Sequence, residues 1–266
     1  MGSMKVDYKN WVPKTMMISF MVASIVFLVC FLIFGIAGVG VGGMVQTIMG
    51  IVFAILFLLC GAYSVWCVIA YRAFSYTGKR KLSKQIITGV AKYINIPDGG
   101  KGLDVGCGSG ALTIACAKKN RNAKMVGIDR WGKEYASFNK KLCESNALSV
   151  GIRNISFWKG DAIKLPFPNE SFDAVTSNYV YHNISGVDKQ KLLLETLRTL
   201  KKGGVFAIHD LMSNARYGDM KVFVKRLKEQ GYERVELIDT TKGQFMTPME
   251  AKVLMLKSST LLIGKK

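Results

Sequence analysis

Two groups of polar residues follow predicted strands, at positions where open α/β sheets bind their ligands. The first is the loop from Leu103 to Gly110, which reads Leu-Asp-Val-Gly-Cys-Gly-Ser-Gly. Its glycines let a ligand approach the backbone closely where a strand turns into a helix. Gly106, Gly108 and Ala111 also satisfy the dinucleotide fingerprint, and Asp129 lies at a suitable distance downstream to hold ribose hydroxyls. The loop therefore predicts a nucleoside ligand without identifying it.

An acidic residue inside this turn favours one cofactor over another. Asp104 lies two residues before the first glycine, where its carboxylate can accept hydrogen bonds from loop amides or from a cationic ligand. It would repel the pyrophosphate of NAD. S-adenosylmethionine instead carries an ammonium and a sulfonium group, so an acid here suits that molecule.

At this point the sequence resembles the class I S-adenosylmethionine-dependent methyltransferases, from about Leu82 to Lys266. The resemblance implies that Asp129 of Val-Gly-Ile-Asp binds the ribose and that Asp161 of Lys-Gly-Asp-Ala lies beside the adenine. Both residues can also be read as ordinary surface acids, and Trp131 either as a wall of the nucleoside site or as a core anchor. The cofactor contacts that the resemblance implies are Asp104, Gly106, Cys107, Gly108, Gly110, Asp129, Arg130, Trp131, Gly160, Asp161, Ala162 and Asn178.

The second polar group follows the fourth and fifth predicted strands and is expected to face the methyl acceptor. It contains the chain's two histidines, His182 and His209, together with Tyr181 and Asp210. Either histidine can take a proton at neutral pH, although a lone histidine more often has a structural role. We predict these four residues as catalytic candidates. The segments 211–217 and 242–249 are candidate lids, with Phe245, Met246 and Met249 as an adaptable apolar wall.

Several acceptor and ligand classes are disfavoured by what the sequence lacks. Asn178-Tyr179 is not followed by the two prolines that enzymes methylating amino groups of nucleic-acid bases usually carry, and no Pro-Cys pair is present for cytosine carbon methylation. The six cysteines have no spacing typical of metal or redox sites, so we expect no metal.

Two long apolar stretches precede these motifs. Residues 16–41 and 44–70 contain no Asp, Glu, Lys or Arg, and each is long enough to cross a bilayer as a helix. The alternatives are a buried hairpin in a soluble core and a secretory signal peptide. Lysines precede the first stretch and basic residues follow the second, which predicts an integral membrane protein whose N-terminus and large domain lie in the cytoplasm. We expect an anchor over 1–72, with a glycine-rich turn at 38–43, and a catalytic domain over 73–266.

Strands and helices alternate after the apolar stretches. We predict strands near 101–105, 124–128, 154–158, 172–177, 203–209, 232–239 and 259–264, and helices near 82–94, 110–119, 132–146, 187–201, 216–230 and 247–255. This order predicts an α/β fold: a Rossmann-like, doubly wound, mostly parallel seven-stranded sheet, with the last two strands as an antiparallel edge.

The net charge of +19 is compatible with an anionic membrane surface or with a nucleic-acid partner. Nine Lys and Arg residues accompany a single acid in residues 1–95, mostly flanking the apolar stretches where anionic headgroups would meet them. The leading hypothesis is therefore a membrane-tethered enzyme that methylates a small hydrophobic or lipid-like acceptor and releases S-adenosylhomocysteine. The resemblance is nearest to the group that includes quinone-biosynthesis methyltransferases. A tethered nucleic-acid or protein methyltransferase, and a membrane sensor that binds S-adenosylmethionine without turnover, remain alternatives.

Overall fold

The computed structural model describes residues 6–132 and 137–266, which form two compact units. The smaller unit is Asn10–Lys84, and the larger one contains Gln85–Lys266 together with the residues up to Lys9. Residues 6–9 therefore pack with the larger unit. The four residues 133–136 lie outside the described part of the chain.

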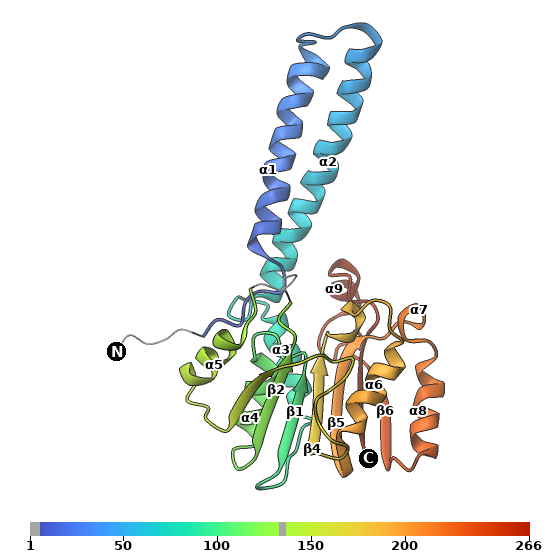
Figure 1. Cartoon of the computed structure of the whole chain (residues 1–266). Helices are drawn as coiled ribbons and strands as arrows, with labels where there is room; N and C mark the ends of the chain where they lie inside the picture. The colour runs from blue at the N-terminus through green and yellow to red at the C-terminus, as the bar shows by residue number, and fades with distance from the viewer. Residues whose placement is uncertain (1–5, 133–136) are drawn as a thin grey trace. The chain divides into compact units, whose positions relative to one another are not determined.

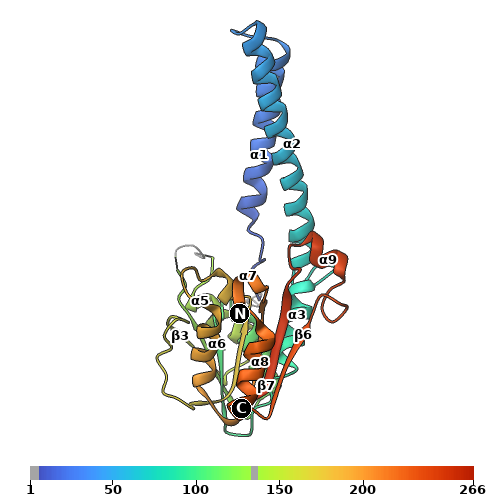
Figure 2. The ribbon, with the colours of Figure 1, turned by 90° about the vertical axis from the view of Figure 1, so that its right-hand side faces the viewer.

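The smaller unit is a pair of long apolar helices. Helix α1 (Lys14–Cys30) continues as a π-helical segment (Phe31–Ile36), and α2 spans Gly43–Phe74. The two helices have mean hydropathies of 2.9 and 2.4, and only 6% and 11% of their most apolar stretches are buried. Both views show them side by side along their length (Figures 1 and 2). They are long and apolar enough to span a membrane, and their exposed side chains do not resemble those of a helical hairpin buried in a soluble core.

The first helix ends five residues before its predicted end. Gly38 and Gly40 adopt left-handed backbone conformations, with φ of 63° and 73°, and so begin the turn. The two helices are in close contact at Gly35 and Gly50, because a Cβ built on Gly35 would fall 2.6 Å from the Gly50 Cα. Small residues thus let the two backbones touch, as in many membrane helix pairs.

The larger unit contains one seven-stranded sheet with the strand order β3-β2-β1-β4-β5-β7-β6. Figure 1 shows the strands side by side, from β2 and β1 in green to β5 and β6 in orange. The strands are β1 (Lys101–Val105), β2 (Lys124–Asp129), β3 (Ile155–Lys159), β4 (Phe172–Asn178), β5 (Leu200–Leu211), β6 (Arg234–Asp239) and β7 (Ser259–Lys265). The helices are α3 (Leu82–Ala91), α4 (Ala111–Lys119), α5 (Lys140–Ser149), α6 (Lys189–Arg198), α7 (Asn214–Tyr217), α8 (Met220–Glu229) and α9 (Pro248–Val253).

The strand directions confirm the predicted fold class. Strands β1 to β5 pair in parallel, whereas β7 runs antiparallel to both β5 and β6. The chain reverses between β6 and β7 without a full crossover, so the predicted antiparallel edge is present. The order of strands reverses direction between β1 and β4, which is where ligands bind in open α/β sheets.

Alternating side chains of the central strands pack against helices on both faces of the sheet. Leu103 and Val105 of β1 belong to one buried core cluster with Leu193 of α6 and Phe223 of α8. The next residue on the other face, Asp104, accepts a hydrogen bond from the Thr113 hydroxyl on α4. Because successive side chains on a strand point to opposite faces, these contacts place α6 and α8 on one face and α4 on the other.

Three of the predicted boundaries that differ from the structure have an identifiable local cause. The helix predicted from residue 132 begins at Lys140, where the Asn139 side chain accepts the Leu142 N–H and caps it. The helix predicted over 216–230 is split into α7 and α8, because Gly218 has a φ of 68° and Asp219 caps a new helix. Strand β5 begins at Leu200, inside the predicted helix, because its first residue pairs with Phe172 of β4.

Candidate active site

The glycine-rich loop after β1 is held against the end of β2. The N–H groups of Gly106 and Cys107 both donate to the Ile128 carbonyl, at 2.8 and 3.1 Å. Gly106 and Gly108 have φ values of 73° and 53°, in the region that favours glycine. A Cβ built on Gly108 would meet no atom within 4 Å. The space in front of Gly108 is therefore open to a ligand.

The predicted ribose acid is oriented by the same loop. One carboxylate oxygen of Asp129 accepts the Gly108 N–H at 2.8 Å, and the other accepts the Trp131 N–H at 2.8 Å. Each oxygen has a second lone pair, so the carboxylate retains capacity for ribose hydroxyls. Asp129 therefore lies at the loop with a fixed side chain, as its predicted role requires.

Trp131 packs as a core anchor, one of the two roles that the sequence left open, and its role as a wall of the nucleoside site stays a prediction. Its indole N–H donates to the Gly108 carbonyl at 3.0 Å, and its ring packs against a buried cluster that includes Cys107, Cys143 and Phe157. Its φ of 44° is unusual for a bulky residue, and these bonds hold it there. Arg130, beside it, is exposed.

Asp104 lies beneath the loop. It is 1% exposed, and its Oδ2 accepts the Thr113 hydroxyl at 2.6 Å. Burial raises its pKa to about 7, and the charge of Asp129 contributes to the rise. A bound cation would favour its ionised form, so this carboxyl suits the ammonium end of a ligand more than an anion.

The third predicted cofactor segment lies at the end of β3. The Gly160 N–H donates to the Asp129 carbonyl at 3.0 Å, which places this segment beside the ribose acid. The Asp161 Oδ1 accepts the Ile163 N–H at 2.9 Å in a tight turn, and both Asp161 and Ala162 are half-buried. The segment therefore lies next to Asp129, and the place of Asp161 beside the adenine stays a prediction.

The ends of β4 and β5 bring the second polar group together. Asn178 and His209 are paired residues on the two strands, and the His209 Nδ1 lies 2.9 Å from the Asn178 Oδ1. The other ring nitrogen lies 2.9 Å from the Thr240 hydroxyl. His209 is fully buried, and burial lowers its pKa to about 3. It is thus a neutral side chain with both nitrogens engaged, and the geometry argues against the role of catalytic base considered above.

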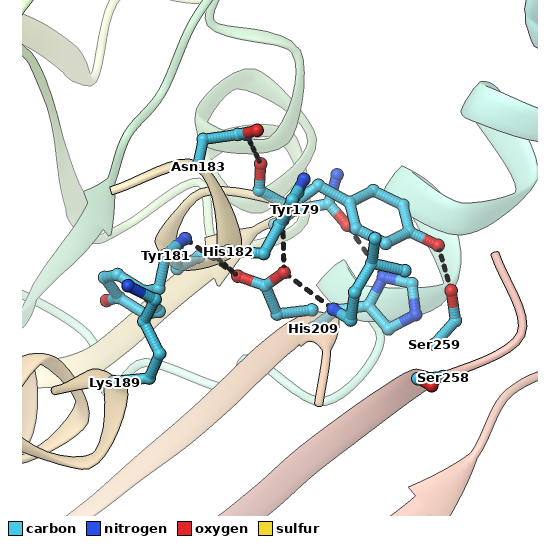
Figure 3. A network of polar contacts seen from close by, with 12 residues as sticks. Tyr179, Tyr181, His182, Asn183, Lys189, His209, Ser258 and Ser259 are labelled. Atoms are coloured by element: carbon cyan, nitrogen blue, oxygen red, sulfur yellow. Dashed lines mark hydrogen bonds and ion pairs between the residues drawn. The ribbon is translucent and has the colours of Figure 1, made fainter. Parts of the chain in front are cut away.

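His182 and Asp210 form a pair at the same edge of the sheet (Figure 3). The His182 Nδ1 lies 2.5 Å from the Asp210 Oδ1, and the His182 side chain is 17% exposed whereas Asp210 is 1% exposed. Burial raises the pKa of Asp210, but hydrogen bonds from His182 and the Leu211 N–H outweigh it, so the net pKa lies below its ordinary value. A carboxylate fixed at Nδ1 leaves Nε2 as the ring nitrogen that can act on a substrate.

Tyr181 does not face this site. It is fully buried, and its hydroxyl lies 2.6 Å from the Thr196 hydroxyl on α6. Its main-chain N–H, rather than its phenol, contributes to the site by donating to Asp210 at 2.8 Å. The phenol belongs to the core cluster, which corrects the expectation that it would act on the acceptor.

Two contacts show that the glycine loop and the His182 segment are neighbours. The Ser177 hydroxyl donates to the Val105 carbonyl at 2.8 Å, and a Cβ built on Gly106 would fall 2.3 Å from a methyl of Val180. The open space at Gly108, the buried acid Asp104 and the oriented Asp129 fit S-adenosylmethionine, which combines a cationic amino-acid end with a ribose.

Several supporting residues were not recognised in the sequence. Thr113 and Ser177 hold the cofactor loop, and Tyr179, with a φ of 55°, donates its N–H to the His209 carbonyl and has its hydroxyl 2.6 Å from that of Ser259. The turn at Tyr179 could have been predicted from its place directly after β4. The contacts of Thr113, Ser177 and Tyr179 with residues distant in the chain carry no local sequence signal.

Comparisons with known proteins agree with this geometry. Residues 103–208 match a family model described as a methyltransferase domain. Over 117 residues the chain is 33% identical to the demethylmenaquinone methyltransferase of Geobacillus stearothermophilus. The aligned residues are 44% of this chain and 47% of that protein. A sterol 24-C-methyltransferase of Gibberella zeae is 31% identical over 129 residues, or 48% of this chain and 32% of that protein. The chain thus spans about half or less of these curated relatives.

Solved structures share the fold. The geranyl diphosphate methyltransferase in complex with GPP and sinefungin superposes with a TM-score of 0.53 and 15% identity, over 74% of this chain and 81% of that one. The cyclase SpnF superposes with a TM-score of 0.54 and 18% identity, over 72% and 85%. At these identities the similarity establishes the fold alone. The family match shows that residues 103–208 are a methyltransferase domain, and S-adenosylmethionine is the cofactor that this match supports.

Proposed function

We propose that this chain is a membrane-tethered enzyme that transfers the methyl group of S-adenosylmethionine to a small hydrophobic, lipid-like acceptor. The observation that carries the proposal is the His182–Asp210 pair beside the glycine loop, with the Gly106–Val180 contact joining the two segments. A nucleoside-binding loop alone would also suit a sensor. A histidine oriented by a buried carboxylate adds a proton acceptor, which a sensor does not need.

The chain's own residues have distinct tasks in this reaction. When bound, the cofactor supplies an electrophilic methyl group on its sulfonium. The glycine loop, Asp129 and Asp104 orient the cofactor. The Nε2 of His182 takes the proton that the acceptor's O–H, N–H or S–H group loses. Asp210 is a positioning residue that holds the His182 tautomer and stabilises the imidazolium that forms.

Two observations support a lipid-like acceptor. The two apolar helices would keep the domain at a bilayer, and related proteins are named for demethylmenaquinone and sterol. Phe245, predicted as part of an apolar wall, is 4% exposed and packs against the buried His209, with 5.3 Å between the ring centroids. Of the other two residues predicted for this wall, Met246 is also buried and Met249 is 67% exposed.

The cofactor part of the proposal is tested by calorimetry on the detergent-solubilised full chain. We expect binding of S-adenosylmethionine but not NAD, and loss of that binding in Asp129→Ala. Asp98→Ala is the matched control, because Asp98 is an exposed acid that contacts only the Asn122 amide among the bonds described. Binding of NAD, or of neither ligand by folded protein, would overturn the assignment.

The acceptor part needs a labelled methyl group. The wild-type chain and His182→Ala are incubated with labelled S-adenosylmethionine and, separately, with a membrane-lipid extract, total RNA and membrane protein. We expect label in the lipid fraction from the wild type only. Label in RNA with a steep salt dependence would favour the nucleic-acid alternative that the net charge of +19 allows. Cofactor binding without label in any fraction would favour a sensor.

We further propose that both ends of the helical pair face the cytoplasm. Lys9 precedes α1 and Lys14 is its first residue, whereas Arg72, Lys79 and Arg80 lie at or beyond the end of α2. Single cysteines introduced near Lys9, Gly40 and Lys79 should react with a membrane-impermeant thiol reagent in inside-out vesicles only at the first and last positions. Reaction at the Gly40 position alone would reverse the orientation.

A further inference from the structure

Residues 6–9, which precede the first apolar helix, are hydrogen-bonded by a buried amide side chain of the larger unit. Asn146 on α5 is 1% exposed. Its Oδ1 accepts the Asp7 N–H at 2.8 Å, and its Nδ2 donates to the Asp7 carbonyl at 2.9 Å. This pair of bonds is what an adjacent β-strand would make, and it joins residues 139 positions apart in the chain.

The same amide also holds the glycine loop. The Asn146 Nδ2 donates to the Ser109 carbonyl at 3.0 Å. All the polar atoms of one buried side chain are therefore divided between Asp7 and the loop. If Asp7 leaves, both the Oδ1 and one N–H bond are left unmade in a buried place, which is costly.

An aromatic side chain of this segment packs against residues that contact the glycine-rich loop. Tyr8 contacts the buried cluster that contains Cys107, Cys143 and Phe157, and Trp131 packs against the same cluster. The Cys143 thiol in turn donates to the Gly108 carbonyl at 3.2 Å. Residues 6–9 thus touch the side chains that carry the loop on which the cofactor binds.

We propose that residues 6–9 are a wall of the cofactor site, with Asn146 as a positioning residue that couples the seating of this segment to the binding of S-adenosylmethionine. The inference rests on the proposed function. Only residues 10–13 separate the segment from the start of α1 at Lys14. Thermodynamic linkage makes the effect reciprocal. If the bound position of residues 6–9 raises the affinity for S-adenosylmethionine, bound S-adenosylmethionine stabilises that position of the segment by the same factor.

The contact offers a matched pair of substitutions at one position. Asp7→Pro removes the N–H that Asn146 accepts, whereas Asp7→Ala keeps it and removes the side chain that forms an exposed ion pair with Lys9 and accepts the Lys9 N–H. We expect Asp7→Pro and Asn146→Ala each to weaken S-adenosylmethionine binding by at least about fivefold, and the double variant to lose no more than either alone. Asp7→Ala should weaken binding less than Asp7→Pro does.

A second control separates coupling from general loss of stability. Asn154 is another amide that holds main chain, donating to the carbonyls of Ala117, Asn120 and Ala123 at the other edge of the sheet. Asn154→Ala should lower the melting temperature without changing the dissociation constant. Hydrogen exchange on the full chain supplies the reciprocal measurement, because added cofactor should slow exchange at the amides of residues 6–9 in the wild type but not in Asn146→Ala.

The outcomes distinguish this inference from the proposed function. If the wild type binds S-adenosylmethionine and both Asp7→Pro and Asn146→Ala bind it equally well while folded, the segment does not contribute to cofactor binding and the inference is wrong. If cofactor leaves the exchange of residues 6–9 unchanged, the coupling is absent. If folded wild type binds no S-adenosylmethionine, the proposed function and this inference fail together.

Discussion

Gly106 lies directly against Val180: a Cβ built on the glycine would fall 2.3 Å from one Val180 methyl and 2.6 Å from the other. The contact joins the loop after β1 to the segment after β4, on the two sides of the point where the strand order reverses. The contact with Val180 thereby brings the segment that contains His182 beside the glycine-rich loop.

Gly106→Ala should therefore disrupt the site through packing as well as backbone strain. The new methyl cannot fit beside Val180, and the φ of 73° is unfavourable for alanine, so we expect a loss of about 2–5 kcal/mol in the free energy of unfolding. Gly108→Ala is the matched variant: it has a similar φ but open space, so it should cost about 1–2 kcal/mol and still fold. Chemical denaturation and calorimetry measure both. Equal stability losses in the two variants would contradict this account.

The raised pKa of Asp104 predicts that cofactor affinity depends on pH. In the free protein this carboxyl has a pKa of about 7, so it is largely protonated at pH 6. An ammonium group favours the carboxylate, which lowers the pKa on binding and releases a proton. Affinity should thus increase with pH by up to about tenfold per unit below pH 7 and level off above it. Calorimetry from pH 5.5 to 8.5 tests this, and Asp104→Asn should flatten the profile.

The two histidines should respond differently to removal. His209 is buried between Asn178 and Thr240, so His209→Ala should cost about 1–3 kcal/mol of stability by leaving buried polar groups unpaired. His182→Ala should lower the rate of methyl transfer by about 10²–10⁴-fold with little change in stability or in cofactor affinity. Thermal unfolding and turnover with the identified acceptor separate the two. A His182→Ala enzyme with full turnover would assign the proton acceptor elsewhere.

The close contact of Gly35 with Gly50 predicts how the apolar helices associate. Gly35→Leu would place a large side chain where the Gly50 backbone lies, so the pair should separate and the full chain should lose activity faster on heating in detergent. Gly42→Ala introduces a methyl with no atom within 4 Å and serves as the control. If Gly35→Leu inactivates no faster than Gly42→Ala, the contact does not hold the helices together.

The sequence by itself determined the fold class and the cofactor motifs of this protein. Uncharged apolar stretches, alternating strands and helices, and the glycine-rich turn at 103–110 are local patterns, because each depends on residues close together in the chain. Asp129 and Gly160 lie beside each other because the carboxyl ends of parallel strands meet at one edge. Asp104, predicted inside the turn, is instead a buried residue of β1 that accepts the Thr113 hydroxyl.

Only the tertiary structure decided what the acceptor-facing side chains and the N-terminal segment do. His182, His209 and Tyr181 are equivalent candidates in the sequence, but burial and partners leave His182 beside Asp210, engage both nitrogens of His209 and turn the Tyr181 phenol into the core. The bond between Asp7 and Asn146 spans 139 residues, and no local pattern encodes it. Contacts of this kind depend on how separate elements pack, which side-chain spacing along a single element does not specify.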